Sequence, residues 1–168
     1  MTCDNSPKSR IIPAPPKPWK NWEELMALAL VEAEKAASAG EVPVGAIVID
    51  SQGSVIGAGY NQTITTCSPA AHAEILALQD AAQSLDNYRL NDCHLIVTME
   101  PCLMCTGAIV HARVAGLVYG AYDTKGGTIS SCLDGLEFPF HNSKVWHMGG
   151  ILEKECSAML NDFFAAKR

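Results

Sequence analysis

Two short motifs constrain the fold of this chain more than any other feature of its sequence. Residues 72–74 read HAE, and residues 101–105 read PCLMC. Each motif is predicted to lie in the first turn of a helix. Cys102 and Cys105 are three residues apart, so both lie on one side of a helix, where two sulfur atoms can reach one ion. If His72 adds an imidazole nitrogen, the fold has to bring the starts of two helices to one metal ion.

The chemistry of these three donors is typical of zinc. The free amides and the dipole at a helix N-terminus favour the thiolate forms of Cys102 and Cys105. Two thiolates and one imidazole suit Zn²⁺, and three protein ligands leave the fourth tetrahedral position open. Zinc lowers the pKa of a bound water from about 16 to about 7. We therefore predict one Zn²⁺ per subunit, held by His72, Cys102 and Cys105, with water or hydroxide as the fourth ligand.

Glu74 lies two residues after His72, close to the predicted ion but not needed as a ligand. A carboxylate in this place can take a proton from water and deliver it to a ring nitrogen and then to a leaving amine. We therefore predict Glu74 as the catalytic residue. A lone C-x-x-C motif also occurs in redox sites and in structural zinc sites, and a lone H-x-E motif is weaker still. Together, each at a predicted helix start, the two motifs favour a catalytic zinc site.

Cysteine content also favours metal binding over disulfides. The chain has seven cysteines, an odd number, and it has no apolar signal core at its polar N-terminus. A disulfide framework is therefore the weaker interpretation. Cys102 and Cys105 form the only close pair in the sequence, and the scattered cysteines, Cys67, Cys93, Cys132 and Cys156, are expected to be small core residues.

Size and charge exclude several classes of protein. A chain of 168 residues has room for one domain with a full hydrophobic core. No stretch approaches the roughly 20 apolar residues of a membrane helix, so we expect a cytoplasmic domain that does not enter membranes. The formal net charge of −6 makes the chain a poor general binder of nucleic acid, because such binding depends largely on neutralising phosphates. Any RNA that the chain binds therefore has to be contacted by local basic side chains.

The order of the expected elements indicates an α/β fold. Five of the nine prolines lie in the first 18 residues, so we predict residues 1–18 as a mobile leader and residues 19–168 as the domain. Asn21 is predicted to cap the first helix, and Pro69 to lie in the first turn of the second. The expected strands are 44–50, 55–60, 95–99, 116–119 and 145–148, and the expected helices begin near 22, 69, 101 and 153. This order predicts a mixed sheet with helices on both faces.

Several stretches around the two motifs resemble the family of bacterial tRNA-specific adenosine deaminases. The resemblance covers nearly all of residues 22–165. Besides the HAE triplet, the matching stretches are residues 41–46, 87–90, 100–105, 120–127 and 162–164. The zinc motif alone is shared by the nucleobase deaminases in general. The flanking stretches narrow the resemblance to the tRNA branch.

The resemblance implies a fold, an activity and partners. The fold is a three-layer α/β/α arrangement of the cytidine-deaminase type, with a mixed five-stranded sheet. The activity is hydrolysis of a C–N bond of an amidine: the wobble adenosine, position 34 of a tRNA anticodon loop, becomes inosine, and ammonia leaves. The expected partners are the anticodon stem-loop of an arginine tRNA and a second copy in a homodimer. Asn61 matches the substrate-binding asparagine of the family, and Asp123 and Lys125 lie in a stretch that resembles its RNA-contacting loop.

Two other functions stay open at this stage. A deaminase of a free base, guanine or cytosine, would use the same metal chemistry, and the acidic charge of the chain favours it. The matches around residues 44, 125 and 163 favour tRNA instead. A non-catalytic subunit that only holds zinc should lack the proton carrier, whereas Glu74 is present.

Overall fold

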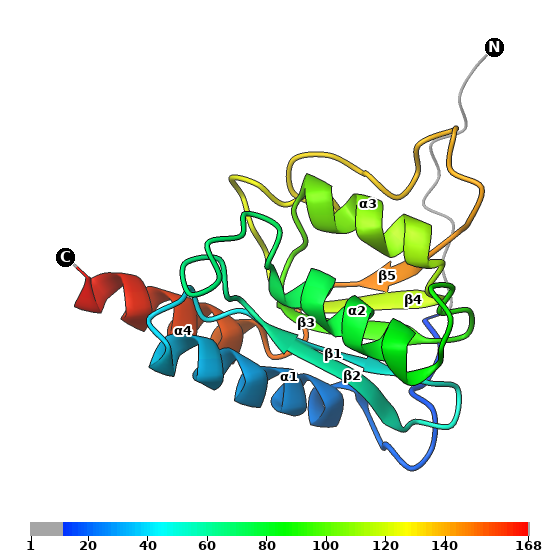
Figure 1. Cartoon of the computed structure of the whole chain (residues 1–168), viewed down its shortest axis with the longest axis horizontal. Helices are drawn as coiled ribbons and strands as arrows, with labels where there is room; N and C mark the ends of the chain where they lie inside the picture. Colours follow the sequence, from blue (N-terminus) through cyan, green and yellow to red (C-terminus); the bar gives the residue numbers. More distant parts are fainter. Residues whose placement is uncertain (1–11, 168) are drawn as a thin grey trace.

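The computed structural model describes residues 12–167. Within this range the chain forms four helices and five strands (Figure 1). In chain order they are α1 (Trp22–Ser38), β1 (Gly45–Ile49), β2 (Val55–Tyr60), α2 (Ala73–Ser84), β3 (His94–Met99), α3 (Leu103–Ala112), β4 (Gly116–Ala121), β5 (Trp146–Met148) and α4 (Glu153–Ala166). None of these helices is both long enough and apolar enough to cross a membrane.

The five strands form one sheet in the order β2-β1-β3-β4-β5. β1 pairs antiparallel with β2 and with β3, whereas β3, β4 and β5 run parallel to one another. Every residue of β1 and β4 is buried, as in strands that are covered on both faces. The mixed five-stranded sheet predicted from the sequence is therefore confirmed.

Helices cover both faces of this sheet. Gly45 and Ala46 point to opposite faces of β1, because side chains alternate along a strand. A Cβ atom on Gly45 would collide with the backbone of α1 at Ala29. Gly59, which pairs with Ala46, faces α2 instead, since its Cβ atom would lie 2.6 Å from the backbone nitrogen of Ala77. With α4 on the side of α1 and α3 on the side of α2, the molecule has the predicted three layers (Figure 1).

The first helix starts where the sequence predicts. Asn21 Oδ1 accepts a hydrogen bond from the backbone N–H of Glu24 at 3.0 Å, which is the expected N-cap contact. The side chain of Glu24 in turn accepts a hydrogen bond from the backbone N–H of Lys20 at 3.0 Å. Both bonds satisfy amides that the helix itself leaves unpaired.

The start of α2 differs from the prediction. A start at residue 69 is wrong, because α2 begins at Ala73 with His72 at its N-cap. Residues 62–71 form turns and irregular backbone instead. The backbone N–H of Thr65 donates to the buried carboxylate of Glu41, 24 residues earlier, which is a contact that local sequence patterns do not reveal. His72 is thereby placed at a helix end rather than inside a helix.

The predicted leader lies partly outside the described residues, because the structure describes none of residues 1–11. Its last part is in contact with the domain. The indole nitrogen of Trp22 donates to the carbonyl oxygen of Pro13 at 3.0 Å. Next to it, the indole nitrogen of Trp19 donates to the carbonyl oxygen of Gly53 at 2.7 Å. These bonds attach the segment before α1 to the domain.

Candidate active site

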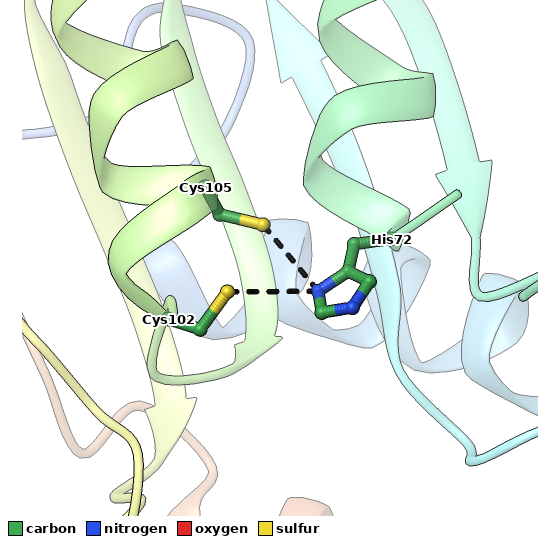
Figure 2. Close-up of side chains that lie close together, drawn as sticks. All are labelled: His72, Cys102 and Cys105. Atoms are coloured by element: carbon green, nitrogen blue, oxygen red, sulfur yellow. Dashed lines mark hydrogen bonds between the residues drawn. The ribbon is translucent and has the colours of Figure 1, made fainter. Parts of the chain in front are cut away.

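The three predicted metal ligands come together where two helices begin. A short segment leads from β3 into α3 and places Cys102 at the N-cap and Cys105 within α3. His72 occupies the N-cap of α2. The Sγ atoms of Cys102 and Cys105 lie 3.7 Å and 3.5 Å from Nδ1 of His72 (Figure 2). One donor atom from each residue lies within 4.8 Å of the others, so residues far apart in sequence form one group.

The spacing of this group fits zinc. Zinc lies about 2.3 Å from sulfur and about 2.0 Å from nitrogen in tetrahedral sites, which separates the two ligand atoms by about 3.5 Å. The observed separations from Nδ1 of His72 to the two sulfur atoms are 3.5 Å and 3.7 Å. The donor set, two sulfurs and one imidazole nitrogen, is also one that zinc prefers. The residues present therefore fit a three-ligand zinc site.

The two cysteines hold their protons with unequal strength. A hydrogen bond from Cys105 lowers the pKa of Cys102 to about 3 although burial opposes this, and the bond with His72 lowers it further. The bond to Cys102, together with burial, raises the pKa of Cys105. The bond with Cys102 also raises the pKa of His72, against the effect of burial. The site therefore favours a thiolate at Cys102, and the thiolate is the form that binds metal.

Glu74 lies beside this group, in the first turn of α2. Its side chain is buried, with an exposed fraction of 4%, and burial raises the pKa of its carboxyl group. Glu74, His72 and Cys102 line one cavity of about 260 Å³. The other residues that line this cavity are Val42, Val44, Asn61, Thr63, Met99, Glu100 and Asp123. A carboxyl group in such a cavity can exchange protons with a bound molecule.

Comparison with known proteins identifies the family. A family model described as MafB19-like deaminase matches residues 20–168. The tRNA-specific adenosine deaminase of Haemophilus influenzae is 44% identical over 146 residues, which cover 87% of this chain and 84% of that protein. The tRNA-specific adenosine deaminase of Bacillus subtilis is 40% identical over 146 residues, with coverage of 87% and 90%. The chain belongs to the tRNA-specific adenosine deaminase family.

Solved structures agree with this family. One comes from a study of A-to-I editing by tRNA:A34 deaminases at the wobble position of transfer RNA. It has a TM-score of 0.78 and 39% sequence identity, and the match covers 82% of this chain and 99% of that one. A guanine deaminase from Nitrosomonas europaea has a TM-score of 0.76 but only 26% identity, with coverage of 91% and 87%. The fold is thus common to both kinds of enzyme, and the sequence is closer to the tRNA-specific adenosine deaminases.

Asn61 is the predicted substrate-binding residue. It lies directly after β2 and lines the cavity. Its Oδ1 atom accepts a hydrogen bond from the backbone N–H of Ala73 at 2.9 Å. Asn61 thus supplies the capping bond at the start of α2 that the side chain of His72 does not make. This bond orients the side chain, whose NH₂ group and second oxygen lone pair can still bond to a ligand.

Two further carboxylates, Glu41 and Glu100, were not predicted as site residues. In the sequence they stand out only by lying in stretches that match the family. Glu41 and Glu100 are both buried. Glu100 directly follows β3 and Glu41 lies four residues before β1, and a buried charge is uncommon without partners. Their partners come from distant loops, which only the structure reveals.

Proposed function

We propose that this chain hydrolyses the wobble adenosine, position 34 of a tRNA anticodon loop, to inosine and ammonia. The observation that supports this most is the three-donor group beside buried Glu74, in a chain 44% identical to a tRNA-specific adenosine deaminase. The expected substrate is the anticodon stem-loop of an arginine tRNA, and the expected place of action is the cytoplasm. The catalytic domain is proposed to be residues 19–168, and the family match over residues 20–168 supports this.

His72, Cys102 and Cys105 are proposed to hold one Zn²⁺ ion per subunit, with water or hydroxide as the fourth ligand. The ion, when bound, activates water as a nucleophile near neutral pH. The protein contributes the N-terminal amides and the dipole of α3, which stabilise negative charge on the two cysteines. The separations of the donor atoms support this assignment.

Glu74 is proposed to move the protons of the reaction. It takes up the proton that the attacking water loses as the oxygen bonds to C6 of adenine. It delivers this proton to N1 of the ring. It then takes the second proton from the oxygen now bonded to C6 and passes it to the amino group, whose bond to C6 breaks as ammonia leaves and the C6 carbonyl forms. Its buried position on the cavity supports this role, because bulk water competes little for protons there.

Binding of the substrate is proposed to depend on two loops. The Asn61 amide donates to and accepts from the base or the ribose, and its bond to Ala73 holds it in place at the cavity. Asp123 lines the cavity, and exposed Lys125 follows two residues later, so both are proposed to contact the flanking RNA. With a net charge of −6, recognition has to depend on the shape of the anticodon loop and on unstacked bases more than on charge.

The active unit is proposed to be a homodimer formed through one surface, which we call the α3 face. Its large apolar side chains are exposed, and they are Tyr88, Leu103, Met104 and Phe140. Tyr88 and Phe140 border one cavity together with Gly107 of α3. Leu103 lies one helical turn before Gly107, on the same side of α3. An apolar surface of this kind supports contact with another protein surface.

The dimer is tested by removing an aromatic side chain from the α3 face. Phe140→Ser is expected to raise the dimer dissociation constant about tenfold, since Phe140 is 76% exposed in the single chain. The measurement is sedimentation equilibrium over a range of concentrations. Phe164→Ser, which removes a 48% exposed phenylalanine from α4, is the control and should leave the constant unchanged. A wild-type chain that stays monomeric contradicts the proposal, as does an equal effect of both substitutions.

The activity is tested with three substrates side by side. Inosine is measured in an arginine anticodon stem-loop with adenosine at position 34, and ammonia is measured with free guanine and with free cytosine. We expect inosine at position 34 and no ammonia above background from either free base. A stem-loop with adenosine moved to a neighbouring position controls for the site of reaction. Ammonia from guanine or cytosine without any inosine would assign the chain to the free-base deaminases instead.

A further inference from the structure

We infer that Glu41 and Glu100 are positioning residues, each of which holds one of the two loops that line the active-site cavity. The loops are residues 61–72, which contain Asn61 and His72, and residues 123–131, which contain Asp123. Both carboxylates are buried, with exposed fractions of 0% and 3%. The effect of the two carboxylates on substrate binding rests on the proposed function, whereas their hydrogen bonds to the loops do not.

Glu100 bonds to the second loop at both of its ends. Its Oε1 atom accepts hydrogen bonds from three successive backbone N–H groups at 3.1, 2.7 and 2.9 Å, those of Ile129, Ser130 and Ser131. Its Oε2 atom accepts from the backbone N–H of Asp123 at 3.1 Å and from the hydroxyl of Ser131. One side chain thus closes the loop between residues 123 and 131.

The loop also packs closely against the carboxyl group of Glu100 at Gly127. A Cβ atom at Gly127 would overlap the carboxyl group of Glu100, so only glycine fits there. Glu100 and Asp123 also line the cavity themselves. The place of Asp123 at the cavity is therefore determined by the carboxylate of Glu100.

Glu41 holds the first loop in the same way. Its Oε1 atom accepts from the backbone N–H of Thr65 at 2.6 Å and from the hydroxyl of Thr65 at 2.8 Å. Its Oε2 atom accepts from the backbone N–H of Ile64 at 3.2 Å and from the hydroxyl of Thr63 at 3.3 Å. Thr63 lines the cavity. The segment between Asn61 and His72 is thus held in its first half, at residues 63–65.

Both positions require a carboxylate rather than an amide. Every partner that bonds to Glu41 or Glu100 in the structure is an N–H or O–H group. A glutamine has the same shape, but one of its two ends is an NH₂ group that cannot accept from a backbone N–H. Exchanging one oxygen for NH₂ therefore places that NH₂ group against N–H or O–H donors of the loop. The lost hydrogen bonds release part of the loop.

The test combines enzyme kinetics with hydrogen–deuterium exchange. Glu100→Gln and Glu41→Gln are expected to raise KM for the anticodon stem-loop at least fivefold, with kcat reduced less than threefold and zinc content unchanged. Exchange should become faster at the amides of residues 129–131 in the first variant and of residues 64–65 in the second. A change in KM with kcat and metal retained is not what general destabilisation produces.

Asp50→Asn is the matched control. Asp50 Oδ1 also accepts two backbone N–H bonds, from Gln52 and Ser54 at 2.9 Å each, but it lies at the end of β1 opposite Val44 and the cavity. This variant should change exchange only in its own turn and leave KM at the wild-type value. If a glutamine variant does not fold, Ser131→Ala and Thr65→Val each remove one bond from the same carboxylates and should give the same pattern with a smaller rise in KM.

The outcomes separate this inference from the proposed function. Wild-type protein that forms no inosine overturns the proposed function, and exchange at the two loops then still decides whether the carboxylates hold them. Unchanged exchange in both glutamine variants overturns the inference. So does a rise in KM below fivefold in the folded glutamine variants, or a loss of activity that is confined to kcat.

Discussion

Glu74 and Glu100 line the same cavity, and both are almost fully buried, yet their surroundings shift the pKa values of their carboxyl groups in opposite directions. Burial raises the pKa of Glu74, which lies at the start of α2. Burial acts in the same direction on Glu100, but the bonds from Ser131, Ser130 and Asp123 outweigh it and lower the pKa of that carboxyl group. The difference between the two lies in the number of loop donors aimed at each carboxylate.

This comparison separates a carboxylate that is free to react from carboxylates that are used for structure. A carboxylate that accepts several backbone N–H groups is stabilised in its charged form and is held in place. Glu41 belongs with Glu100 in this respect, because its bonds with Thr65 and Ile64 outweigh burial and lower its pKa. Glu74 makes no comparable set of loop bonds and stays available for proton transfer.

The sharpest way to break this comparison is to remove the reactive carboxylate. Glu74→Ala is expected to lower kcat by about 10³-fold or more while zinc content stays stoichiometric, because the proposed proton carrier is lost and the three metal ligands remain. Single-turnover inosine formation and elemental analysis measure the two effects. Gln83→Ala, exposed on the same helix, is the control. Near-normal turnover in Glu74→Ala would remove Glu74 from the mechanism.

The next largest effect is expected from the metal ligands. Cys102→Ala should lose most of its zinc and lower the melting temperature by about 5 °C or more, because metal binding is coupled to folding. Differential scanning calorimetry with and without added zinc measures both effects. Cys67→Ala removes an exposed thiol and should retain zinc. Equal zinc content in the two variants would contradict the assignment of Cys102 as a ligand.

A smaller effect distinguishes the structural carboxylates by pH. The pKa of Glu41 lies below its ordinary value of 4.5, so its charged form stabilises the fold above that pH and this contribution is lost as the pH falls through the lowered pKa. Glu41→Gln should therefore lower the free energy of unfolding by about 1–3 kcal/mol at pH 7, and by progressively less below pH 4.5. Urea unfolding of both proteins between pH 7 and pH 3 measures this. A difference that is constant over the range would contradict it.

The sequence predicted what local patterns and motif spacing can encode. The sheet and its covering helices follow from the apolar strands and helix signals, and Asn21 caps α1 as predicted. The spacing of Cys102 and Cys105 indicated one shared ion, and the structure places His72 beside them. These features depend on residues close together in the sequence or on two motifs that together indicate one kind of metal site.

The rest depends on contacts between distant segments. The start of α2 was misplaced because residues near 65 are bonded to Glu41, which lies outside any local window. The partners of Glu100 lie 23 to 31 residues away, and no helical or strand period connects them. The orientation of Asn61 likewise follows from its bond to Ala73, formed only once β2 and α2 are packed together.

The central claim is that His72, Cys102 and Cys105 together hold one zinc ion that the reaction needs. Elemental analysis of pure protein, performed on the same sample that is assayed for inosine formation, tests it most directly. The account predicts one zinc per chain and activity that falls in proportion as a chelator removes the metal. Full activity in protein that contains no transition metal would contradict it.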